Sequence, residues 1–430
     1  MTATPRRRPA ARRARHGLLD VRPLRHSRPF LRLWGGTSLS AVGGQVAALA
    51  VLYQVWELTH SPVWTGALGL VRAVPLVVFG LVGGVLADQV DRRCVVRWTT
   101  AAQVLAALGL AAQAVSDLGS LAVLLLLVAV QSAAGALGAP ALRTFPVRLL
   151  GRELVGAGIA LQHLSFQAAM LIGPALAGVV LGAVGLTPAY LVQALAHVAA
   201  LYAVIRLPAM PVAGPHSARG PRAFVDGLRH IVGSRVLSGL YVTDLVATLL
   251  AMPVALFPMV NEERFGGSPE TLGLFLSAIA VGGLLAGLGS GTVTRSDRPG
   301  AVQLGAAGAW GAALALVGIA GPLWLALLAL AVAGAADTVS VISRGAAVQL
   351  VTPDTHRGRV TSVEHVIGIA GPELGNFRAG VVAGATSAAF AAASGGLACV
   401  AGILLVALTN RPLRQFRVSR DIPASEERAG

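Results

Sequence analysis

The sequence predicts an all-α integral membrane protein whose twelve transmembrane helices form two pseudo-symmetric six-helix bundles. Three observations support this fold class: repeated apolar segments, arginines confined to alternate loops, and an internal duplication. Of the 430 residues, 55% are apolar and only 12% are charged, and the mean hydropathy is +0.72. Soluble domains are about a quarter charged, so this composition is typical of a membrane protein.

The apolar segments are about 20 residues long, which is enough to cross a hydrocarbon core of about 30 Å. The predicted spans are 33–56, 65–87, 98–117, 121–142, 154–184, 187–206, 236–258, 271–293, 301–320, 323–343, 361–384 and 387–409. All connections between them are short except the one near 207–235. Little chain therefore remains for a soluble domain.

The basic residues lie on one side of the predicted helices. The chain has no lysine, and 31 of its 34 arginines fall in the two tails and in alternate loops, whereas the opposite loops contain only Arg264. By the positive-inside rule, both termini are expected in the cytoplasm. This topology accounts for the net charge of +15 and for the RRRPAARRAR tail, so we expect no nucleic-acid partner.

Several other function classes are disfavoured by composition. Without lysine there is no GxxxxGK[ST] phosphate loop, and hence no ATPase engine in this chain. Cys94 and Cys399 form no CxxC pair, and no histidines or carboxylates stand at metal-ligand spacing. We expect neither a metal nor a cofactor.

The chain is also similar to itself. An offset of 207 residues relates Ser61 to Ser268, Pro62 to Pro269, Gly66 to Gly273, Gly80 to Gly287 and Gly84 to Gly291; an offset of 202 relates His163 to His365, Gly173 to Gly375 and Gly178 to Gly380. We therefore divide the chain into a basic tail (1–29), a first half (30–206), a linker with an amphipathic helix (207–235), a second half (236–409) and a C-terminal tail (410–430). Two parallel halves suit a transporter that moves one half against the other around a central site.

The stretch GGVLADQVDRR at 83–93 resembles the loop signature between the second and third helices of the major facilitator superfamily. Gly84, Asp88, Arg92 and Arg93 match the signature, whereas Gln89 and Asp91 depart from it. An aspartate at the membrane edge can accept hydrogen bonds from the free amides that begin another helix.

The resemblance implies a latch in which Asp88 meets Thr361 and Ser362, with Arg143 as a further partner. Such a latch would favour the outward-facing state. In the alternative interpretation, the loop supplies only topogenic charge and a tight turn.

Other segments narrow the resemblance. MLIGPALAG, which contains Gly173, Pro174 and Gly178, resembles the glycine-proline motif of the superfamily's exporters and would kink its helix and pack it across the halves. FVDGLRHIV, MPVALFP, SPETLGLFLSAIAVGG and TPDTHRGRVTS, in this order, resemble the enterobactin exporter group. This resemblance implies proton-driven export of a catecholate siderophore, with macrolide or multidrug efflux as the alternative.

Charged residues within the spans are candidate sites, since each costs about 3 kcal/mol at membrane depth. Arg72 could bind an anionic or phenolic substrate or pair with an acid of the second half. Asp244 could carry a proton or form an ion pair, for which Arg72 is the partner considered. Glu373 could couple protons or substrate, or pair with Arg378 or another helix.

The remaining intramembrane groups have weaker cases. His163 could take part in coupling, although a lone histidine on an apolar helix is more often a packing residue. Glu364 is expected at an interface, and Asp337 completes the set.

These observations together predict a secondary active exporter of a small organic molecule that exchanges it for protons. The bias toward alanine, glycine, valine and arginine suggests a bacterial cytoplasmic membrane, and we expect a monomer. A polytopic membrane enzyme would need a catalytic cluster near one membrane face, and the short loops offer none. We therefore do not expect an enzyme.

Overall fold

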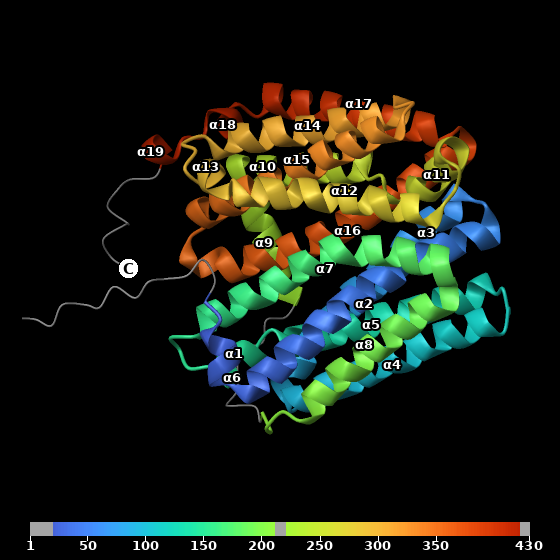
Figure 1. Ribbon diagram of the computed structural model, residues 1–430. Helices are drawn as coiled ribbons and strands as arrows, with labels where there is room; N and C mark the ends of the chain where they lie inside the picture. The colour runs from blue at the N-terminus through green and yellow to red at the C-terminus, as the bar shows by residue number, and fades with distance from the viewer. Residues whose placement is uncertain (1–19, 211–220, 422–430) are drawn as a thin grey trace, which may run out of the picture.

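A computed structural model describes residues 20–210 and 221–421. Six long helices form the first bundle: α2 (Arg28–Thr59), α3 (Pro62–Gln89), α4 (Arg92–Val115), α5 (Leu121–Leu142), α7 (Val155–Val184) and α8 (Leu186–Ile205). The second bundle contains α10 (Arg235–Ala251), α12 (Pro269–Leu288), α14 (Pro299–Ile319), α15 (Leu323–Val351), α16 (Asp354–Ala385) and α17 (Ala388–Thr409). Figure 1 shows the bundles side by side, one coloured blue to green and the other yellow to red.

Short helices join or extend the long ones. These are α1 (Arg22–His26), α6 (Phe145–Leu149), α9 (Pro221–Gly233), η1 (Val254–Leu256), α11 (Phe257–Phe265), α13 (Ser290–Thr294), α18 (Arg411–Gln415) and α19 (Val418–Asp421). The span expected at 236–258 is interrupted after α10 and continues through η1 into α11, with Pro253 in the break. Because proline lacks an amide hydrogen and restricts the residue before it, the helix ends there.

Serine residues begin many of these helices. The Oγ atoms of Ser27, Ser120, Ser234, Ser268 and Ser387 accept hydrogen bonds from backbone amides in the first turns of α2, α5, α10, α12 and α17. A side-chain acceptor at this position satisfies an amide that has no partner inside the helix. These caps set the starts of helices whose ends the apolar pattern alone leaves indefinite.

Eleven helices in the described part of the chain are long and apolar enough to cross a membrane. α16 is 32 residues long but lies outside that group, because Glu364, Glu373 and Arg378 make it more polar. It nevertheless packs within the helical assembly against α3, α9, α10 and α17. The predicted all-α fold of twelve long helices in two bundles is confirmed.

The long helices alternate in direction, so their connections gather at two ends of the molecule. The end with the turns near 90, 143–154, 289–298 and 352 carries the arginine-rich loops, and we call it the basic end. The end with the turns near 60, 116–120, 185, 266–268, 320–322 and 386 is called the opposite end. The most extensive contacts between the bundles are those of α3 with α16 and of α7 with α12, and smaller ones join α2 to α11 and α12 and α3 to η1.

Both helix pairs meet at the opposite end. A Cβ atom placed on Gly380 would lie 3.0 Å from the Cα atom of Gly66, and one placed on Gly273 would lie 3.1 Å from the Cα atom of Gly178. Glycine permits such close backbone approach, and in membrane proteins it is enriched at helix contacts for this reason. By contrast, a Cβ atom on Gly80 or Gly84, near the basic end of α3, would meet no atom within 4 Å.

Candidate transport site

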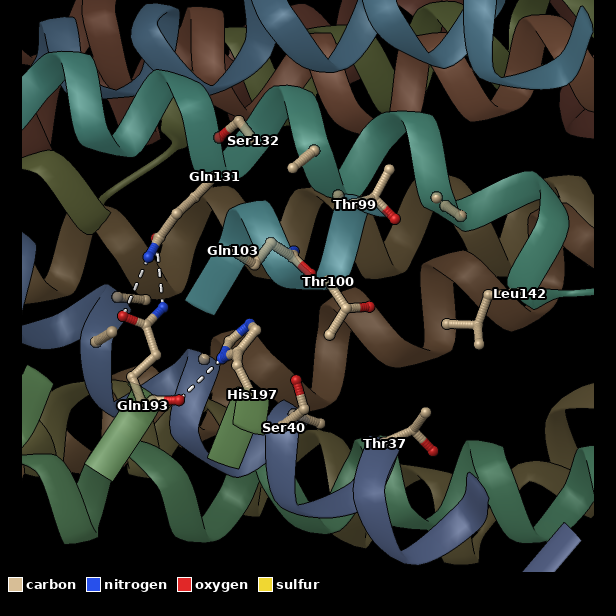
Figure 2. A pocket seen from close by; sticks show the side chains of 18 of the residues that line it. Thr37, Ser40, Thr99, Thr100, Gln103, Gln131, Ser132, Leu142, Gln193 and His197 are labelled. Carbon is tan, nitrogen blue, oxygen red and sulfur yellow. Dashed lines mark hydrogen bonds between the residues drawn. The ribbon is translucent and has the colours of Figure 1, made fainter. Parts of the chain in front are cut away.

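A polar cavity of about 440 Å³ lies inside the first bundle (Figure 2). Its walls come from α2, α3, α4, α5 and α8, and its polar lining residues are Thr37, Ser40, Arg72, Thr99, Thr100, Gln103, Gln131, Ser132, Gln193 and His197. The cavity extends from Thr37 and Leu142, toward the basic end, to Arg72 near the middle of α3 and Val51 in the second half of α2. Arg72 is its only arginine.

Two amide side chains join opposite walls of this cavity. Gln131 on α5 and Gln193 on α8 exchange hydrogen bonds of 3.2 and 3.3 Å, and the Nδ1 atom of His197 lies 2.9 Å from the backbone oxygen of Gln193 (Figure 2). Such contacts fix the orientation of the amides before any ligand arrives. Because these lining groups are neutral donors and acceptors, the cavity suits a ligand rich in hydroxyl or amide groups.

Arg72 connects this cavity to the second bundle. Its guanidinium interacts electrostatically with the carboxylate of Glu373 on α16 and with Tyr190. A Cβ atom placed on Gly69, one turn before Arg72, would lie 2.8 Å from the Oε2 atom of Glu373. The charges of Arg72 and Glu373 therefore face each other across the boundary between the bundles.

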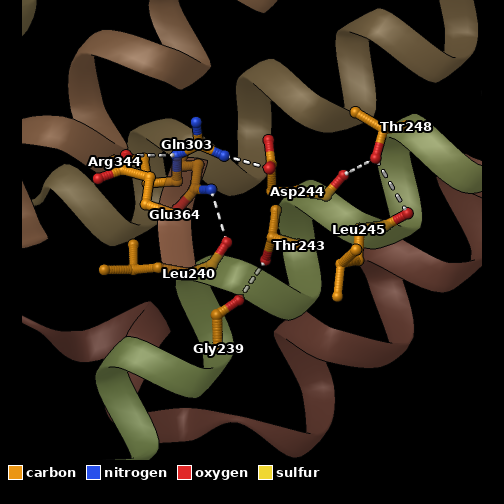
Figure 3. Close-up of polar contacts among 9 residues, drawn as sticks. All are labelled: Gly239, Leu240, Thr243, Asp244, Leu245, Thr248, Gln303, Arg344 and Glu364. Carbon is orange, nitrogen blue, oxygen red and sulfur yellow. Dashed lines mark hydrogen bonds and ion pairs between the residues drawn. The ribbon is translucent and has the colours of Figure 1, made fainter. Parts of the chain in front are cut away.

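A second polar group lies within the second bundle (Figure 3). Arg344 on α15 forms an ion pair with Asp244 on α10, and its Nε atom lies 3.7 Å from the Oε1 atom of Glu364 on α16. The side chains of Arg344 and Asp244 are only 9% and 13% exposed. Asp337, seven residues before Arg344 on α15, interacts electrostatically with both members of the ion pair.

This cluster corrects two pairings considered from the sequence. Asp244 is paired with Arg344 rather than with Arg72. Arg378 donates a 2.6 Å hydrogen bond to the backbone oxygen of Leu250 in the last turn of α10, so the pairing of Arg378 with Glu373 is also wrong. The carbonyls at a helix C-terminus carry partial negative charge, which makes them natural acceptors for a guanidinium.

Arg344 itself was missed by sequence analysis, because the span predicted at 323–343 ends just before it. In the structure α15 continues to Val351. The segment AAVQLV that follows Arg344 is largely apolar and could have indicated this extension. An arginine counted as a loop residue is therefore a buried residue of the second bundle.

Around the latch motif, the structure describes contacts within the first bundle. Asp91 caps α4 by accepting a 2.8 Å hydrogen bond from the amide of Arg93, and it accepts a second, of 3.2 Å, from the amide of Met210. Arg93 donates a 2.6 Å hydrogen bond to the oxygen of Leu207. Arg92 is buried in the same region. The loop is thus tied to the segment that follows α8.

The predicted latch partners face each other across a space. The side chain of Asp88 lies outside the described part of the structure, so its partner stays a prediction. Arg143, Thr361 and Ser362 line a second cavity of about 440 Å³ between α3, α5, α9 and α16. Gly84 has open space beside it. The bundles are therefore apart at the basic end, where the latch would close.

The remaining predicted site residues lie elsewhere. Gly173 packs against the side chain of Gln45 on α2, Pro174 is inside α7, and Gly178 lies against the start of α12. His163 is exposed on α7 and lines neither of the two cavities described above. In the described residues, no group of three His, Cys, Asp or Glu side chains is placed to hold a metal ion.

This fold and these intramembrane polar groups define a membrane transporter of the major facilitator type. Residues 20–426 match the family model described as "Transmembrane secretion effector", and the chain belongs to that family. The resemblance noted in the sequence is confirmed.

Curated relatives cover nearly the whole chain. The enterobactin exporter EntS of Shigella boydii serotype 18 is 27% identical over 404 residues, which are 93% of this chain and 96% of the relative. The EntS protein of Escherichia coli O1:K1 / APEC is 27% identical over 405 residues, with the same coverage. Since the relatives are transporters, the protein is a transporter related to enterobactin exporters.

Solved structures share the fold. The nucleoside transporter NupG matches with a TM-score of 0.69 at 14% identity, over 90% of this chain and 100% of that one. A bacterial homologue of the iron transporter ferroportin in an inward-facing state matches with a TM-score of 0.68 at 16% identity, over 90% and 99% of the two chains. At these identities the likeness concerns the fold alone.

Proposed function

We propose that the protein exports a small organic molecule across the bacterial cytoplasmic membrane in exchange for protons, by alternating access. Its substrate is a siderophore of catecholate type. The observation that carries this proposal is that the bundles are packed together at the opposite end and separated at the basic end. With the basic end in the cytoplasm, as the positive-inside rule expects, the conformation is open toward the side from which an exporter takes its substrate.

Contacts at the opposite end support a closed outer gate. Trp56 on α2 donates a hydrogen bond to Glu262 on α11, and the hydroxyl of Thr65 on α3 donates a 2.8 Å hydrogen bond to the oxygen of Ala255. The amide of Ala255 in turn donates to Asn376 on α16 at 3.2 Å. The bonds of Trp56 and Thr65 join the two bundles and would break when the gate opens, whereas the bond to Asn376 lies within the second bundle and holds Ala255 in place.

In this proposal the halves 30–206 and 236–409 move as units about the linker 207–235, and the protein works as a monomer. The outward-facing state closes the basic end, which brings Asp88 and Arg143 to Thr361 and Ser362. Substrate binds in the first-bundle cavity, where the amides accept and donate hydrogen bonds and Arg72 faces a phenolate oxygen. The EntS relatives support the catecholate assignment.

Transport into inside-out membrane vesicles tests this function. Enterobactin and a macrolide would be supplied separately, with and without a proton uncoupler. We expect uptake of enterobactin that the uncoupler abolishes, and no uptake of the macrolide. Uptake of the macrolide would instead indicate a multidrug pump, and uncoupler-insensitive uptake would contradict proton exchange.

The variant Arg72→Ala provides a more local test. We expect it to lower enterobactin uptake at least about tenfold, because a charge-assisted hydrogen bond contributes about 1.5–3 kcal/mol. Arg298→Ala, an exposed arginine in a loop at the basic end, is the matched control and should transport normally. Equal uptake by Arg72→Ala and the control would remove Arg72 from the substrate site.

A further inference from the structure

We propose that Arg344 is a shared counter-ion and that Asp244 is the group that binds the transported proton, with Arg344 moving from Asp244 to Glu364 when Asp244 is protonated. This inference rests on the proposed function and assigns its coupling step to three residues of the second bundle. The geometry that points to it is one guanidinium on α15 that lies between a carboxylate on α10 and another on α16 (Figure 3).

The carboxylates near Arg344 outnumber its single positive charge. Asp244, Asp337 and Glu364 surround Arg344, so the group has two more carboxylates than guanidinium groups. Placing several carboxylates close together disfavours their simultaneous ionisation, and such groups take up protons as a coupled set. The guanidinium keeps its charge at any working pH. A proton that enters this group must therefore bind to a carboxylate.

Arg344 has a hydrogen-bond donor that is not used in this conformation. Its buried Nε atom has no hydrogen-bond partner among the described residues, although the Oε1 atom of Glu364 is 3.7 Å away. That separation is too long for a hydrogen bond. A small shift of the guanidinium would form this bond. The structure thus holds Arg344 engaged with Asp244 and close to an alternative acceptor.

The helices beside the Arg344–Asp244 ion pair contribute few polar or charged side chains. On α10, the hydroxyl of Tyr241 interacts electrostatically with Asp244, Arg344 and Glu364. On α14, the polar neighbour is Gln303, whose amide donates a 2.9 Å hydrogen bond to the oxygen of Leu240. α14 and α17 contain no Asp, Glu, Lys or Arg, and α12 contains only Glu270, at its opposite end. α12, α14 and α17 therefore offer no basic residue that could neutralise Asp244 in place of Arg344.

Helix α16 links the group around Arg344 to the contacts between the two bundles. Glu364 lies on α16, which contacts α3 of the first bundle near Gly66 and carries Thr361 and Ser362 at the basic end. When Asp244 takes a proton from water, its carboxylate becomes neutral, the ion pair breaks, and Arg344 pairs with Glu364. Loss of the proton restores the first pair. Each protonation thus changes the force between α15 and the helix that contacts the other bundle.

Asp337 offers a route for the proton. Its side chain is exposed, whereas Arg344 and Asp244 are largely buried. It lies on the same helix as Arg344, seven residues and hence about two turns earlier. A proton bound at Asp337 is therefore within about two helical turns of the ion pair.

The test measures conformation without any substrate. Spin labels at Val147→Cys and Thr292→Cys, both at the basic end and in different bundles, would report the distance between the bundles after Cys94 and Cys399 are replaced by alanine. In reconstituted full-length protein, we expect this distance distribution to change between pH 8 and pH 5.5. Asp244→Asn should show the low-pH distribution at both pH values.

Three further variants make the result specific. Asp354→Asn, which removes an exposed carboxylate of α16 outside the cluster, is the matched control and should keep the full pH response. Glu364→Gln should move the midpoint about one pH unit toward acid, because Arg344 then lacks its alternative acceptor and stays with Asp244. Arg344→Lys, which retains the positive charge but not the planar fork, should keep a pH response with an altered midpoint.

The proposal would be overturned if the distance between the spin labels in the wild-type protein did not change with pH. It would also be overturned if this distance changed with pH in Asp244→Asn as it does in the wild type. Loss of the response in Glu373→Gln but not in Asp244→Asn would overturn it as well and move the proton to Glu373. Because no substrate is needed, failure of enterobactin transport in vesicles would refute the proposed function without affecting this result.

Discussion

The two bundles place different chemistry between corresponding helices. In the first bundle, the space beside α2 and α5 is a cavity with neutral amides and hydroxyls on its walls. In the second, α10 and α15 are joined there by the Arg344–Asp244 ion pair. The offset of 207 relates Asp244 to Thr37, and the offset of 202 relates Arg344 to Leu142, and both of these first-bundle residues line the cavity. Duplication has thus left one bundle suited to binding and the other to charge exchange.

The largest expected effect concerns stability. Arg344→Met leaves Asp244 ionised and without its partner in the second bundle, which should lower the free energy of unfolding by about 3–5 kcal/mol. Arg97→Met, a matched change at an exposed arginine of α4 in the first bundle, should cost no more than about 1 kcal/mol. Thermal unfolding in detergent would measure both. Similar losses in the two variants would erase the contrast between the bundles.

A smaller effect is expected on substrate affinity. Gln131→Ala removes an amide from the cavity wall and leaves Gln193 without its partner, so KM should rise about tenfold. Its pH profile should stay that of the wild type, since the coupling group is in the other bundle. Gln349→Ala, on the exposed basic end of α15, is the control. A changed pH profile in Gln131→Ala would mean that the bundles do not divide the tasks.

The contact between Trp56 and Glu262 has one partner in each bundle. Trp56→Phe keeps the ring and removes the donor, which should favour opening of the outer gate by about 1–2 kcal/mol. Labels at the opposite end would show this as a population shift of about tenfold. Trp324→Phe at the same end is the control, because Trp324 is 65% exposed. An unchanged population in Trp56→Phe would show that the hydrogen bond does not hold the gate.

The smallest expected effect is on the protection of the C-terminal segment from proteolysis. Two loops at the basic end, one in each bundle, use an aspartate to bind a following segment. Asp91 holds the segment after α8, and Asp297 accepts a 2.8 Å hydrogen bond from the amide of Ser419 in the C-terminal segment. This backbone hydrogen bond lowers the pKa of Asp297 below its usual range. The bond is therefore fully present above the usual pKa of an aspartate and is lost as pH falls through the lowered value.

Limited proteolysis can detect this loss. The C-terminal segment should be equally protected at pH 7 and pH 5 in the wild type, and Asp297→Asn should make it modestly more susceptible at both. A change in the wild type between pH 7 and pH 5 would contradict the lowered pKa.

The sequence was sufficient for the helices but not for their partners. Apolar length predicts the spans closely, since the span expected at 121–142 is also that of α5. Helix ends beyond the hydrocarbon depend on local caps and packing, and α15 runs on to Val351 for this reason. That difference moved Arg344 from a loop into the bundle.

Partners across the bundle are set by helix rotation and neighbour order, which hydropathy does not encode. Asp244 and Arg344 are 100 residues apart, and only the packing of α10 near α15 brings them together. The charged residues Arg72, Asp244 and Glu373 could be picked out because charge at membrane depth is costly. Their pairing, and the neutral cavity made of common polar residues, required the structure.

The linker helix α9 has a practical consequence. Gly227 lies against the backbone of Arg359 on α16, where a Cβ atom would come 3.2 Å from the Cβ atom of Arg359, and the ring of His230 stacks on that of His356 at 4.4 Å. α9 is therefore expected to move together with the second bundle. Val225 on α9 is 51% exposed. A fluorophore attached there would report the rotation of the second bundle. Such a probe could follow turnover in real time without a label on any membrane-spanning helix.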